Sequence, residues 1–493
     1  MKEVSSKYYG ENGIHRVPLW RIAGFSLNNQ ATNFYLMLMT MVSYYLTGFV
    51  GVLVITASSF STVMRIWDGV TDPVIGFIVD KTNGRWGKNR PFMVIGNVIL
   101  LVSSFVMFHV THLLPENKVI RFAFFIVVAL IYYVGYTFQC VVTKSAQPCL
   151  TNDPKQRPQF AIFDNIFMIV RQIFFQVLCV WLIGKYGTYY STELFHDMWL
   201  VTAVLSGICT IIAIISIAPK DREEFYGTGK VVKVGLKDYW ETLKGNRAIQ
   251  MLVIAASTDK LANQVKTSTV MIVMIGVVVG DYAINGTLTM LTSIPTIIIT
   301  VVFIGTMATR LGQKKALVIG SAGSVIFSTL LIALWLFGDP TSMSDGNGKI
   351  IFGAFTILYV LLTAVNSGFT GMASSIVIPM TADCADYEVY RSGKYVPGLI
   401  GTLFSFVDKL VSSLSPLIAG VMYAAIGFSE NLPDVTTPYS DSLLYVSIFL
   451  MYGMTIIGVA ANLIAMHFYP LNKEKMEEIQ EEIAAIKARD AAE

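Results

Sequence analysis

The chain has 493 residues, of which 54% are hydrophobic and 14% are charged, and its formal net charge is +3. Soluble domains carry about 25% charged residues, so this chain has too few charges to cover a water-facing surface. These proportions argue against a soluble enzyme, a disordered regulator and a nucleic-acid-binding protein. The composition predicts a protein that crosses a membrane many times.

The apolar stretches define the predicted helices. A membrane-spanning helix needs about 20 mostly apolar residues. About twelve such stretches are expected, at residues 21–47, 52–80, 91–111, 121–149, 158–184, 194–219, 248–275, 284–309, 313–338, 350–380, 397–427 and 440–470. The longest polar interruption, 220–247, divides them six and six.

We therefore predict an all-α polytopic membrane fold with 12 transmembrane helices in two six-helix halves. The halves are residues 21–219 and 248–470, with a leader at 1–20, a linker at 220–247 and a tail at 471–493. A short repeat supports related halves, since Gly87–Gly96 and Gly312–Gly320 both place a basic turn before a similar helix start. Parallel six-helix halves are the architecture of the major facilitator fold.

Lysine and arginine positions predict the orientation in the membrane. Loops after the even-numbered spans are rich in Lys and Arg, whereas loops after odd-numbered spans hold only Lys118, Arg121, Lys185 and Lys349. Basic loops face the cytoplasm. We therefore expect a multi-pass protein of the inner, cytoplasmic membrane with both termini, the leader, the linker and the tail on the cytoplasmic side.

The tail carries apolar residues at helical spacing among charged ones: Met476, Ile479, Ile483 and Ile486. This pattern predicts an amphipathic helix lying against the cytoplasmic face. A regulatory or partner-binding helix is the alternative interpretation.

Span two carries charges at a depth where charges are costly. Asp68 and Asp72 are four residues apart and share one helix face, with Arg65 one turn before Asp68. An ionised side chain at the bilayer centre costs at least about 2.5–3.5 kcal/mol, and neighbouring carboxylates repel each other. A bound Na⁺ or a proton would supply positive charge, because one arginine cannot neutralise both acids. We expect a cation site here; the alternative is a structural ion pair with Arg65.

Polar side chains also interrupt spans one and four. Span one carries Asn28, Asn29, Gln30, Thr32 and Asn33, and span four carries Tyr132, Tyr133 and Tyr136. Amides and hydroxyls suit a hydroxyl-rich ligand, since each sugar OH both donates and accepts, and an aromatic ring can stack on a sugar face. Polar contacts between helices and ordinary aromatic packing explain the same residues equally well.

Further charged residues fall inside predicted spans: Lys144, Asp164, Arg171, Asp259, Lys260, Lys266, Asp408 and Lys409. Each is a candidate for substrate contact or for an internal ion pair.

Four stretches together resemble a known family. They are Arg65–Asp68 with Asp72–Pro73, Arg85–Lys88 with Arg90–Pro91, Ala382–Tyr387, and Lys409. In this order the chain resembles the glycoside–pentoside–hexuronide:cation symporters along nearly its whole membrane portion. The resemblance implies a major facilitator fold and symport of a sugar or glycoside with Na⁺, Li⁺ or H⁺ by alternating access, without a cofactor beyond the coupling ion.

The resemblance also implies site residues. Asp68 and Asp72 fall at the family's cation-binding acids, and Thr137 at its cation-site threonine. Thr71 replaces an asparagine of that site, which leaves Na⁺ and H⁺ as alternatives. Lys409 falls on a lysine near the sugar and cation sites.

The expected sugar site departs from that of the melibiose-type members. Thr32 and Cys140 stand where those proteins have acids, and Lys144 stands in place of a tryptophan. Their span-five arginine falls near Asn165, with Arg171 further along. Together with Asn29, Asn33, Tyr136 and Lys409, these are the predicted substrate-binding residues. Losing two acids and gaining a lysine favours an anionic substrate, such as a hexuronide or a sulfonated sugar.

A second group of predicted functional residues lies in the basic turns after spans two and eight and in the acidic motif Ala382–Tyr387. Arg and Lys in the turns can pair with acids or helix C-termini when the cytoplasmic side is closed. The candidate gating residues are Arg85, Arg90, Arg310, Lys314, Asp383 and Asp386. Charge that only sets topology is the alternative.

Other classes of function are distinguished by what the sequence contains. There is no phosphate-binding G-x-x-x-x-G-K-[ST] loop, and His15, His109, His112, His196 and His467 are scattered along the chain, so we do not expect an enzyme. A Na⁺-coupled lysolipid carrier of the same superfamily, and a membrane sensor or channel, are the alternatives. The expected partners are a small sugar or glycoside and the lipid bilayer, without nucleic acid, and the protein is expected to be a monomer.

Overall fold

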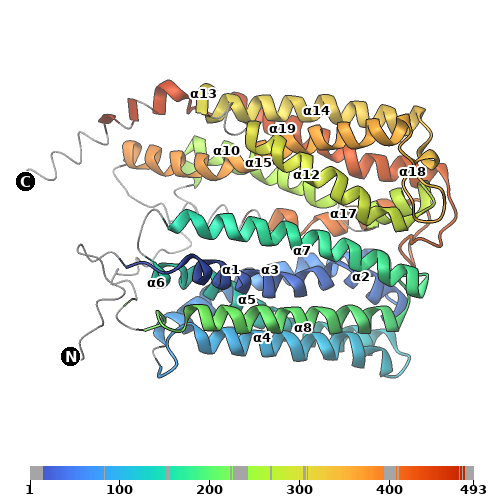
Figure 1. Ribbon diagram of the computed structural model, residues 1–493, viewed down its shortest axis with the longest axis horizontal. Coiled ribbons are helices and arrows are strands. Elements are labelled where there is room, and N and C mark those ends of the chain that lie inside the picture. The colour runs from blue at the N-terminus through green and yellow to red at the C-terminus, as the bar shows by residue number, and fades with distance from the viewer. Residues whose placement is uncertain are drawn as a thin grey trace, which may run out of the picture. The chain divides into compact units, whose positions relative to one another are not determined.

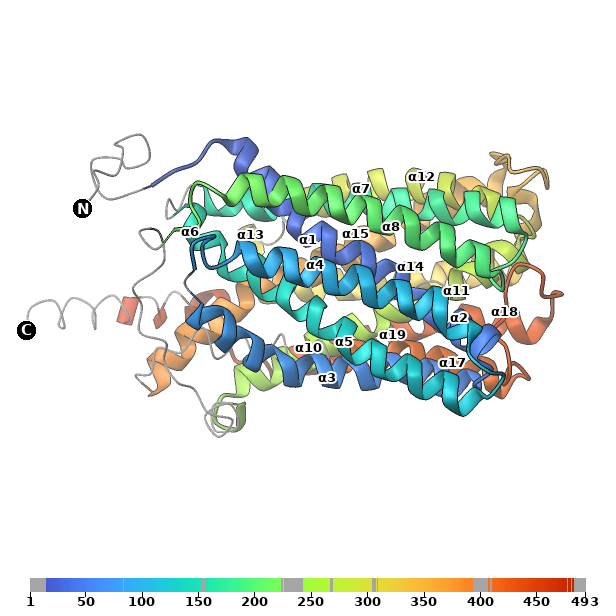
Figure 2. The ribbon, with the colours of Figure 1, turned by 90° about the horizontal axis from the view of Figure 1, so that it is seen from below.

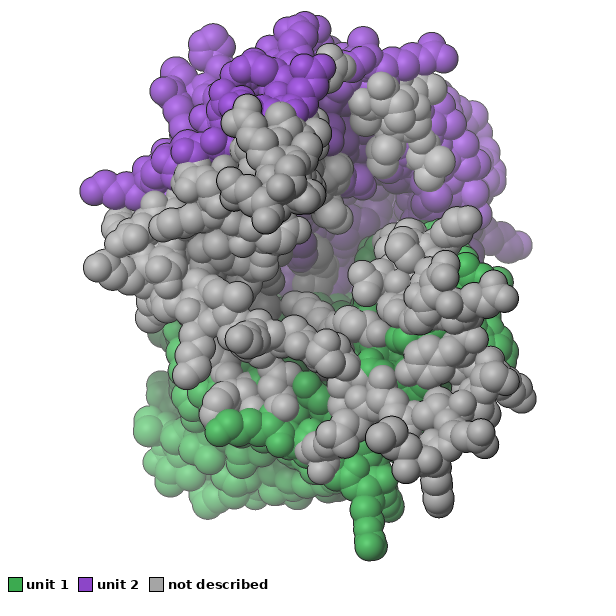
Figure 3. Space-filling view, turned by 90° about the vertical axis from the view of Figure 1, so that its left-hand side faces the viewer, with its two compact units in different colours: residues 1–231, 429–432 green, residues 232–428, 433–493 purple. Residues whose placement is uncertain are grey.

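A computed structural model describes residues 15–82, 84–151, 156–222, 225, 243–266, 269–303, 307, 309–392, 407, 410–476, 478–479 and 481–482. Within these ranges the regular structure is helical, with isolated bridges between Gly84 and Gly87 and between Ser344 and Ile350. The chain divides into two compact units, residues 1–231 with 429–432 and residues 232–428 with 433–493 (Figure 3). Most of the stretch 220–247 lies outside the described residues.

Unit 1 consists of long helices that run alongside one another (Figures 1 and 2). Its helices are α1 (Leu19–Thr40), α2 (Val42–Tyr45), η1 (Leu46–Val50), α3 (Val54–Lys81), α4 (Arg90–Phe105), η2 (Val106–Val110), η3 (Thr111–Leu113), α5 (Lys118–Ser145), α6 (Gln147–Leu150), α7 (Arg157–Tyr186) and α8 (Thr192–Ile217).

Unit 2 has the same kind of construction. Its helices are α10 (Arg247–Val265), α11 (Thr269–Met271), η5 (Ile272–Val278), η6 (Tyr282–Ile284), α12 (Asn285–Phe303), α13 (Thr309–Leu311), α14 (Gln313–Phe337), η8 (Pro340–Met343), α15 (Ala354–Ser392), α17 (Ser415–Ala425), α18 (Asp441–Ile448), η9 (Phe449–Gly453) and α19 (Met454–Phe468).

Several long helices begin where the sequence supplies a capping side chain. Asn117 accepts hydrogen bonds from backbone N–H groups of α5, Ser191 from α8, Asn246 from α10 and Ser440 from α18. These side chains satisfy N–H groups that have no partner within the first turn of a helix. Local sequence therefore fixes where these helices start.

Eight helices in the described residues are long and apolar enough to cross a membrane, and α10 with the segment Thr269–Val278 forms a ninth candidate that is bent by 44°. The helices α1 and α3 are long enough but too polar to be counted. They are the helices that carry the amides of span one and the acids of span two. The all-helical polytopic prediction is confirmed, whereas the count of twelve stays a prediction.

Close contact between helices positions the polar side chains of unit 1. Helix α1 packs along α8 and also touches α5 and α7, while α3 and α4 both pack on α5. At the α4–α5 contact, a Cβ on Gly96 would come within 3.0 Å of the carbonyl oxygen of Gly135, so the two backbones approach closely only because these residues are glycines. Polar groups on α1, α3 and α5 are thereby held near one another.

The tail belongs to unit 2 and packs into the hydrophobic core of that unit. Ile479 is fully buried in the hydrophobic core of this unit, and Met476 lies against the same core. The apolar face of the tail therefore covers protein over the described residues. Ile483 and Ile486 lie outside them.

Candidate functional site

Asp68 is the centre of a cluster of oxygen atoms between α3 and α5. Its carboxylate is fully buried, and its Oδ1 accepts a hydrogen bond from Thr137 Oγ1 at 2.9 Å. Thr71 Oγ1 lies 3.0 Å from the backbone oxygen of Asp68 and 3.1 Å from Thr137 Oγ1. Thr137 Oγ1 is also 2.9 Å from the backbone oxygen of Tyr133. Three of the four predicted cation-site residues thus lie together.

Positive charge reaches this cluster from one side. Arg65 Nη1 is 3.6 Å from Asp68 Oδ2 and 3.5 Å from the hydroxyl of Tyr136, whose ring also faces the guanidinium. Asp72, the fourth predicted residue, is half-buried one turn beyond Asp68 on α3. Two acids and one arginine therefore occupy this stretch of helix.

The oxygen atoms of the cluster are of the kind that binds a cation. Thr71 and Thr137 make four oxygen–oxygen contacts of 2.9–3.1 Å, with the Asp68 carboxylate, with each other and with two backbone carbonyl oxygens. Oxygen ligands from carboxylates, hydroxyls and carbonyls are what hard cations prefer.

The amides of α1 divide into two groups. The Asn28 side chain donates to Thr143 Oγ1 at 2.8 Å, which ties α1 to α5, and Thr32 donates to the backbone oxygen of Asn28. Asn28 and Thr32 are both buried. Asn29 and Asn33 are half-buried and bonded to each other, with Asn33 Nδ2 at 3.0 Å from Asn29 Oδ1. Helix–helix bonding thus explains Asn28, while Asn29 and Asn33 face a different neighbour.

Other predicted substrate-binding residues are placed to different extents. Tyr136 is 8% exposed, and Cys140 and Arg171 are half-buried. The backbone of Lys144 and Asn165 is helical, but their side chains lie outside the described part, as does all of Lys409. The structure therefore brings Tyr136 next to the cation cluster and leaves these three side chains as predictions.

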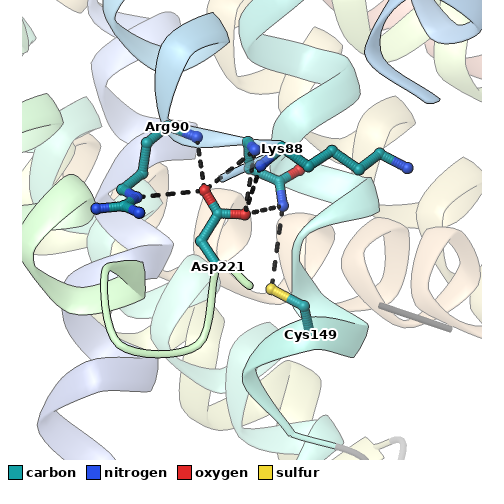
Figure 4. A network of polar contacts seen from close by, with 5 residues as sticks. Lys88, Arg90, Cys149 and Asp221 are labelled. Carbon is teal, nitrogen blue, oxygen red and sulfur yellow. Dashed lines mark hydrogen bonds and ion pairs between the residues drawn. The ribbon is translucent and has the colours of Figure 1, made fainter. Parts of the chain in front are cut away.

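The basic turn after α3 is held by an acid that the sequence did not single out (Figure 4). Asp221, 1% exposed, accepts hydrogen bonds from the backbone N–H groups of Lys88, Asn89 and Arg90, from Asn89 Nδ2 at 2.9 Å, and from Arg90 Nε at 3.3 Å. Its negative charge also faces the N-terminus of α4, where it opposes the helix dipole favourably. Gly87 has φ +86° and lies so close to Asp221 that a Cβ would collide with the carboxylate.

The sequence did not identify Asp221 as a structural residue, because the residues around it look like those of a solvated loop. It lies in Lys220–Arg222, a charged triplet within the predicted linker, and such a run usually indicates a solvated loop. The predicted gating residue Arg90 is thus bonded within unit 1.

Comparison with known proteins identifies the kind of molecule. The family described as MFS/sugar transport protein matches residues 28–473. The chain belongs to this family. A glucuronide carrier protein homolog of Escherichia coli (strain K12) is 24% identical over 479 residues, which cover 94% of this chain and 95% of that protein. An isoprimeverose transporter of Lactiplantibacillus pentosus is 22% identical over 469 residues, covering 93% and 91%.

The fold of this MFS transporter is shared with solved structures. A bacterial homologue of the human lysosomal transporter Spinster covers 92% of this chain and 96% of its own, with a TM-score of 0.58 and 12% identity. That likeness shows the fold alone. Together the matches confirm the predicted family, the major facilitator fold and the assignment as a membrane transporter of sugars rather than an enzyme.

The gating candidates in unit 2 of the transporter lie near the ends of its helices. Lys314 Nζ donates to the backbone oxygen of Tyr469 at 2.6 Å, and Arg310 is exposed. Burial and the neighbouring Asp386 raise the pKa of the Asp383 carboxyl to about 6, and a hydrogen bond from Gln313 opposes that shift. Arg85 in unit 1 is exposed. Their role in gating stays a prediction.

Three histidines that are scattered in the sequence gather in the transporter. The rings of His109 and His196 stack with centroids 4.0 Å apart, and His112 lies 5.7 Å from His196. Tyr45 bonds to His112 at 3.2 Å. Among the described residues, no group of three or more His, Cys, Asp or Glu side chains is arranged to hold a metal ion. Stacking brings these rings together without making a metal site.

Proposed function

We propose that this transporter carries a glycoside together with a cation, Na⁺ or H⁺, by alternating access, and that the cation binds at Asp68, Asp72, Thr71 and Thr137. The observation that carries the proposal is the oxygen-rich contact between α3 and α5, where the hydroxyls of Thr71 and Thr137 lie against the buried Asp68. A cation bound there is surrounded by the carboxylate, hydroxyl and backbone oxygens of this contact. Cation binding then changes the charge of this unit during each transport cycle. This change of charge couples the flux of the cation to the flux of the glycoside.

Uptake into proteoliposomes tests the coupling. The full chain is reconstituted and given 4-nitrophenyl β-D-glucuronide under separately imposed Na⁺ and proton gradients. The Asp68→Asn and Asp72→Asn variants remove a charge with little change of shape, so accumulation should collapse while exchange of internal for external glycoside persists. Asp197→Asn is the matched control, because Asp197 is bonded to Lys185 and Tyr186 on α7. Accumulation against a gradient by both site variants would show that the cation binds elsewhere.

An anionic glycoside is the proposed substrate class. The loss of acids at Thr32 and Cys140 and the gain of Lys144 make this part of the chain more positive than in melibiose-type members. A relative named as a glucuronide carrier protein homolog covers nearly the whole chain and supports this class. The isoprimeverose transporter among the relatives makes a neutral glycoside the comparison substrate. A panel of matched uronides and neutral glycosides in the same uptake assay distinguishes the two.

The orientation and assembly are proposals of the same kind. In unit 1 the segment before α1 bonds to the end of α6, through Thr151 and the backbone of His15, and the turn before α4 bonds to Asp221 after α8. The basic loops therefore share one end of this unit, which supports placing that end, with both termini, in the cytoplasm of the inner membrane. We expect a monomer in which Arg85, Arg310 and Lys314 affect the transport rate more than the substrate affinity.

A further inference from the structure

A carboxylate on α7, Asp164, stands apart from the oxygen cluster on α3 and α5. Asp164 is half-buried within the candidate membrane span Ile162–Tyr186. A carboxylate at such a depth is costly unless hydrogen-bond donors surround it. Its backbone oxygen accepts a bond from Gln30 Nε2 at 3.4 Å, which places this turn of α7 against α1. The helices α1 and α7 pack along each other, so this contact is part of a longer interface.

Two amide side chains of α1, Asn29 and Asn33, lie near the Asp164 carboxyl. Asn33 Nδ2 donates to Asn29 Oδ1 at 3.0 Å and to the Asn29 backbone oxygen at 2.7 Å. The Asn29 oxygen is therefore occupied, and its NH₂ group is left to donate. The Asn29 side chain interacts with the Asp164 carboxyl. The Asn29 amide therefore lies between Asn33 and the Asp164 carboxyl, with its NH₂ group left as the donor on the side of the acid.

The Asp164 carboxyl is incompletely used as an acceptor. Asp164 Oδ1 is buried and has no hydrogen-bond partner among the described residues. An ionised carboxylate offers about four acceptor positions, so a single amide leaves most of them open. Hydroxyl groups are the donors that would fill them, and a pair of adjacent sugar hydroxyls matches the two oxygens of a carboxylate.

A donor lies on the same face of α7 as this acceptor. Arg171 is seven residues beyond Asp164, about two turns and roughly 10.5 Å along the helix, and it points in nearly the same direction. Its Nε is buried and also lacks a partner within the described part of the chain, and its guanidinium interacts with Tyr136 on α5. One face of α7 therefore presents an acceptor for hydroxyls and, about two turns further along, a cationic donor.

We propose that Asp164, held by Asn29 and Asn33, is a substrate-binding acid that accepts hydrogen bonds from the sugar hydroxyls of the transported glycoside. The inference rests on the proposed function. Asp164 also orients an anionic glycoside, because the substrate's acid group is repelled by Asp164 and attracted to Arg171, so the hydroxyl-bearing edge faces Asp164.

Deoxy analogues test this assignment. Binding of 4-nitrophenyl β-D-glucuronide and its three mono-deoxy analogues at C2, C3 and C4 to the purified full-length protein is measured by calorimetry at saturating cation. In the unmodified protein, at least one analogue should bind about ten- to hundredfold more weakly than the parent, as expected for a lost hydrogen bond to a charged group. In Asp164→Asn the parent should weaken to a similar extent, and the difference between parent and analogue should largely disappear.

Cation binding and a control variant separate the possible outcomes. Asp164→Asn should keep the cation affinity of the unmodified protein, and Asp197→Asn, which also removes a carboxylate from unit 1, should keep both affinities. The assignment is overturned if Asp164→Asn binds the parent glycoside as tightly as the unmodified protein does and still binds the deoxy analogue more weakly. It is also overturned if Asp164→Asn loses cation coupling while its glycoside affinity is unchanged.

If Asp164→Asn does not fold, Asp164→Glu replaces it, because glutamate keeps the carboxylate. This variant must still bind the same deoxy analogue more weakly than the parent, and equal binding of the two rejects the proposal. Absence of glycoside binding and uptake by the unmodified protein instead refutes the proposed function, and this inference with it.

Discussion

Replacing Asp221 by asparagine should destabilise unit 1 more than any single change at an exposed ion pair. The carboxylate accepts five hydrogen bonds, three of them from consecutive backbone N–H groups at the start of α4. An amide keeps the shape but has one accepting oxygen, and its NH₂ group would face donors. The change therefore leaves buried N–H groups without acceptors.

The expected cost follows from these contacts. Removing one partner from a buried, charged hydrogen-bond network costs about 3–5 kcal/mol. Asp197 is the matched control, because its side chain is 32% exposed and its bond to Lys185 lies at the surface. A surface pair of this kind contributes at most about 1 kcal/mol. The difference between the two variants should therefore be several kilocalories per mole.

Thermal unfolding in detergent measures this difference, with glycoside binding measured in parallel. The midpoint of Asp221→Asn should fall well below that of Asp197→Asn, while glycoside affinity is retained because Asp221 lies away from the cation cluster. A midpoint loss no larger than that of the control would refute the role assigned to the Asp221 network.

Three further predictions concern single residues. Thr137→Val removes a hydroxyl that donates to Asp68, so the cation concentration for half-maximal uptake should rise about tenfold; an unchanged value would remove Thr137 from the cation site. Lys144→Gln should weaken a uronide about ten- to hundredfold more than its neutral analogue, and equal losses would contradict an anionic substrate. The pKa of Asp383 is raised from 3.8 to about 6, so its contribution to stability is fully present below pH 4 and is lost as the pH rises through 6. Asp383→Asn should therefore raise the unfolding midpoint at pH 7.5 but not at pH 4, and a gain that does not depend on pH would refute this titration.

The sequence predicts those features that depend on one helix at a time. Hydrophobic length gives the spans, and a spacing of four places Asp68 and Asp72 on one face. The position of Thr137 beside Asp68 came from family resemblance, because spacing within α5 does not reveal which helix lies against it. The amides of α1 show the same limit. Asn28 bonds to Thr143 on α5 whereas Asn29 faces Asp164 on α7, and only the rotation of α1 between its neighbours decides this.

Asp221 and the histidine stack were missed for a related reason. Asp221 contacts Asn89 across 132 residues of sequence, and a charge in a predicted linker looks the same whether it is solvated or buried. His109 and His196 come from helices far apart in the chain, so no spacing rule connects them.

The bond between Asp221 and the turn before α4 also sets an order of events during synthesis. Asp221 leaves the ribosome only after every helix of unit 1 has been made, so the turn at Lys88–Arg90 reaches the membrane long before its acceptor exists. Until then the backbone N–H groups of this turn wait for the acceptor that they have in the folded unit. Completion of this half therefore depends on one of the last residues of unit 1 to be synthesised.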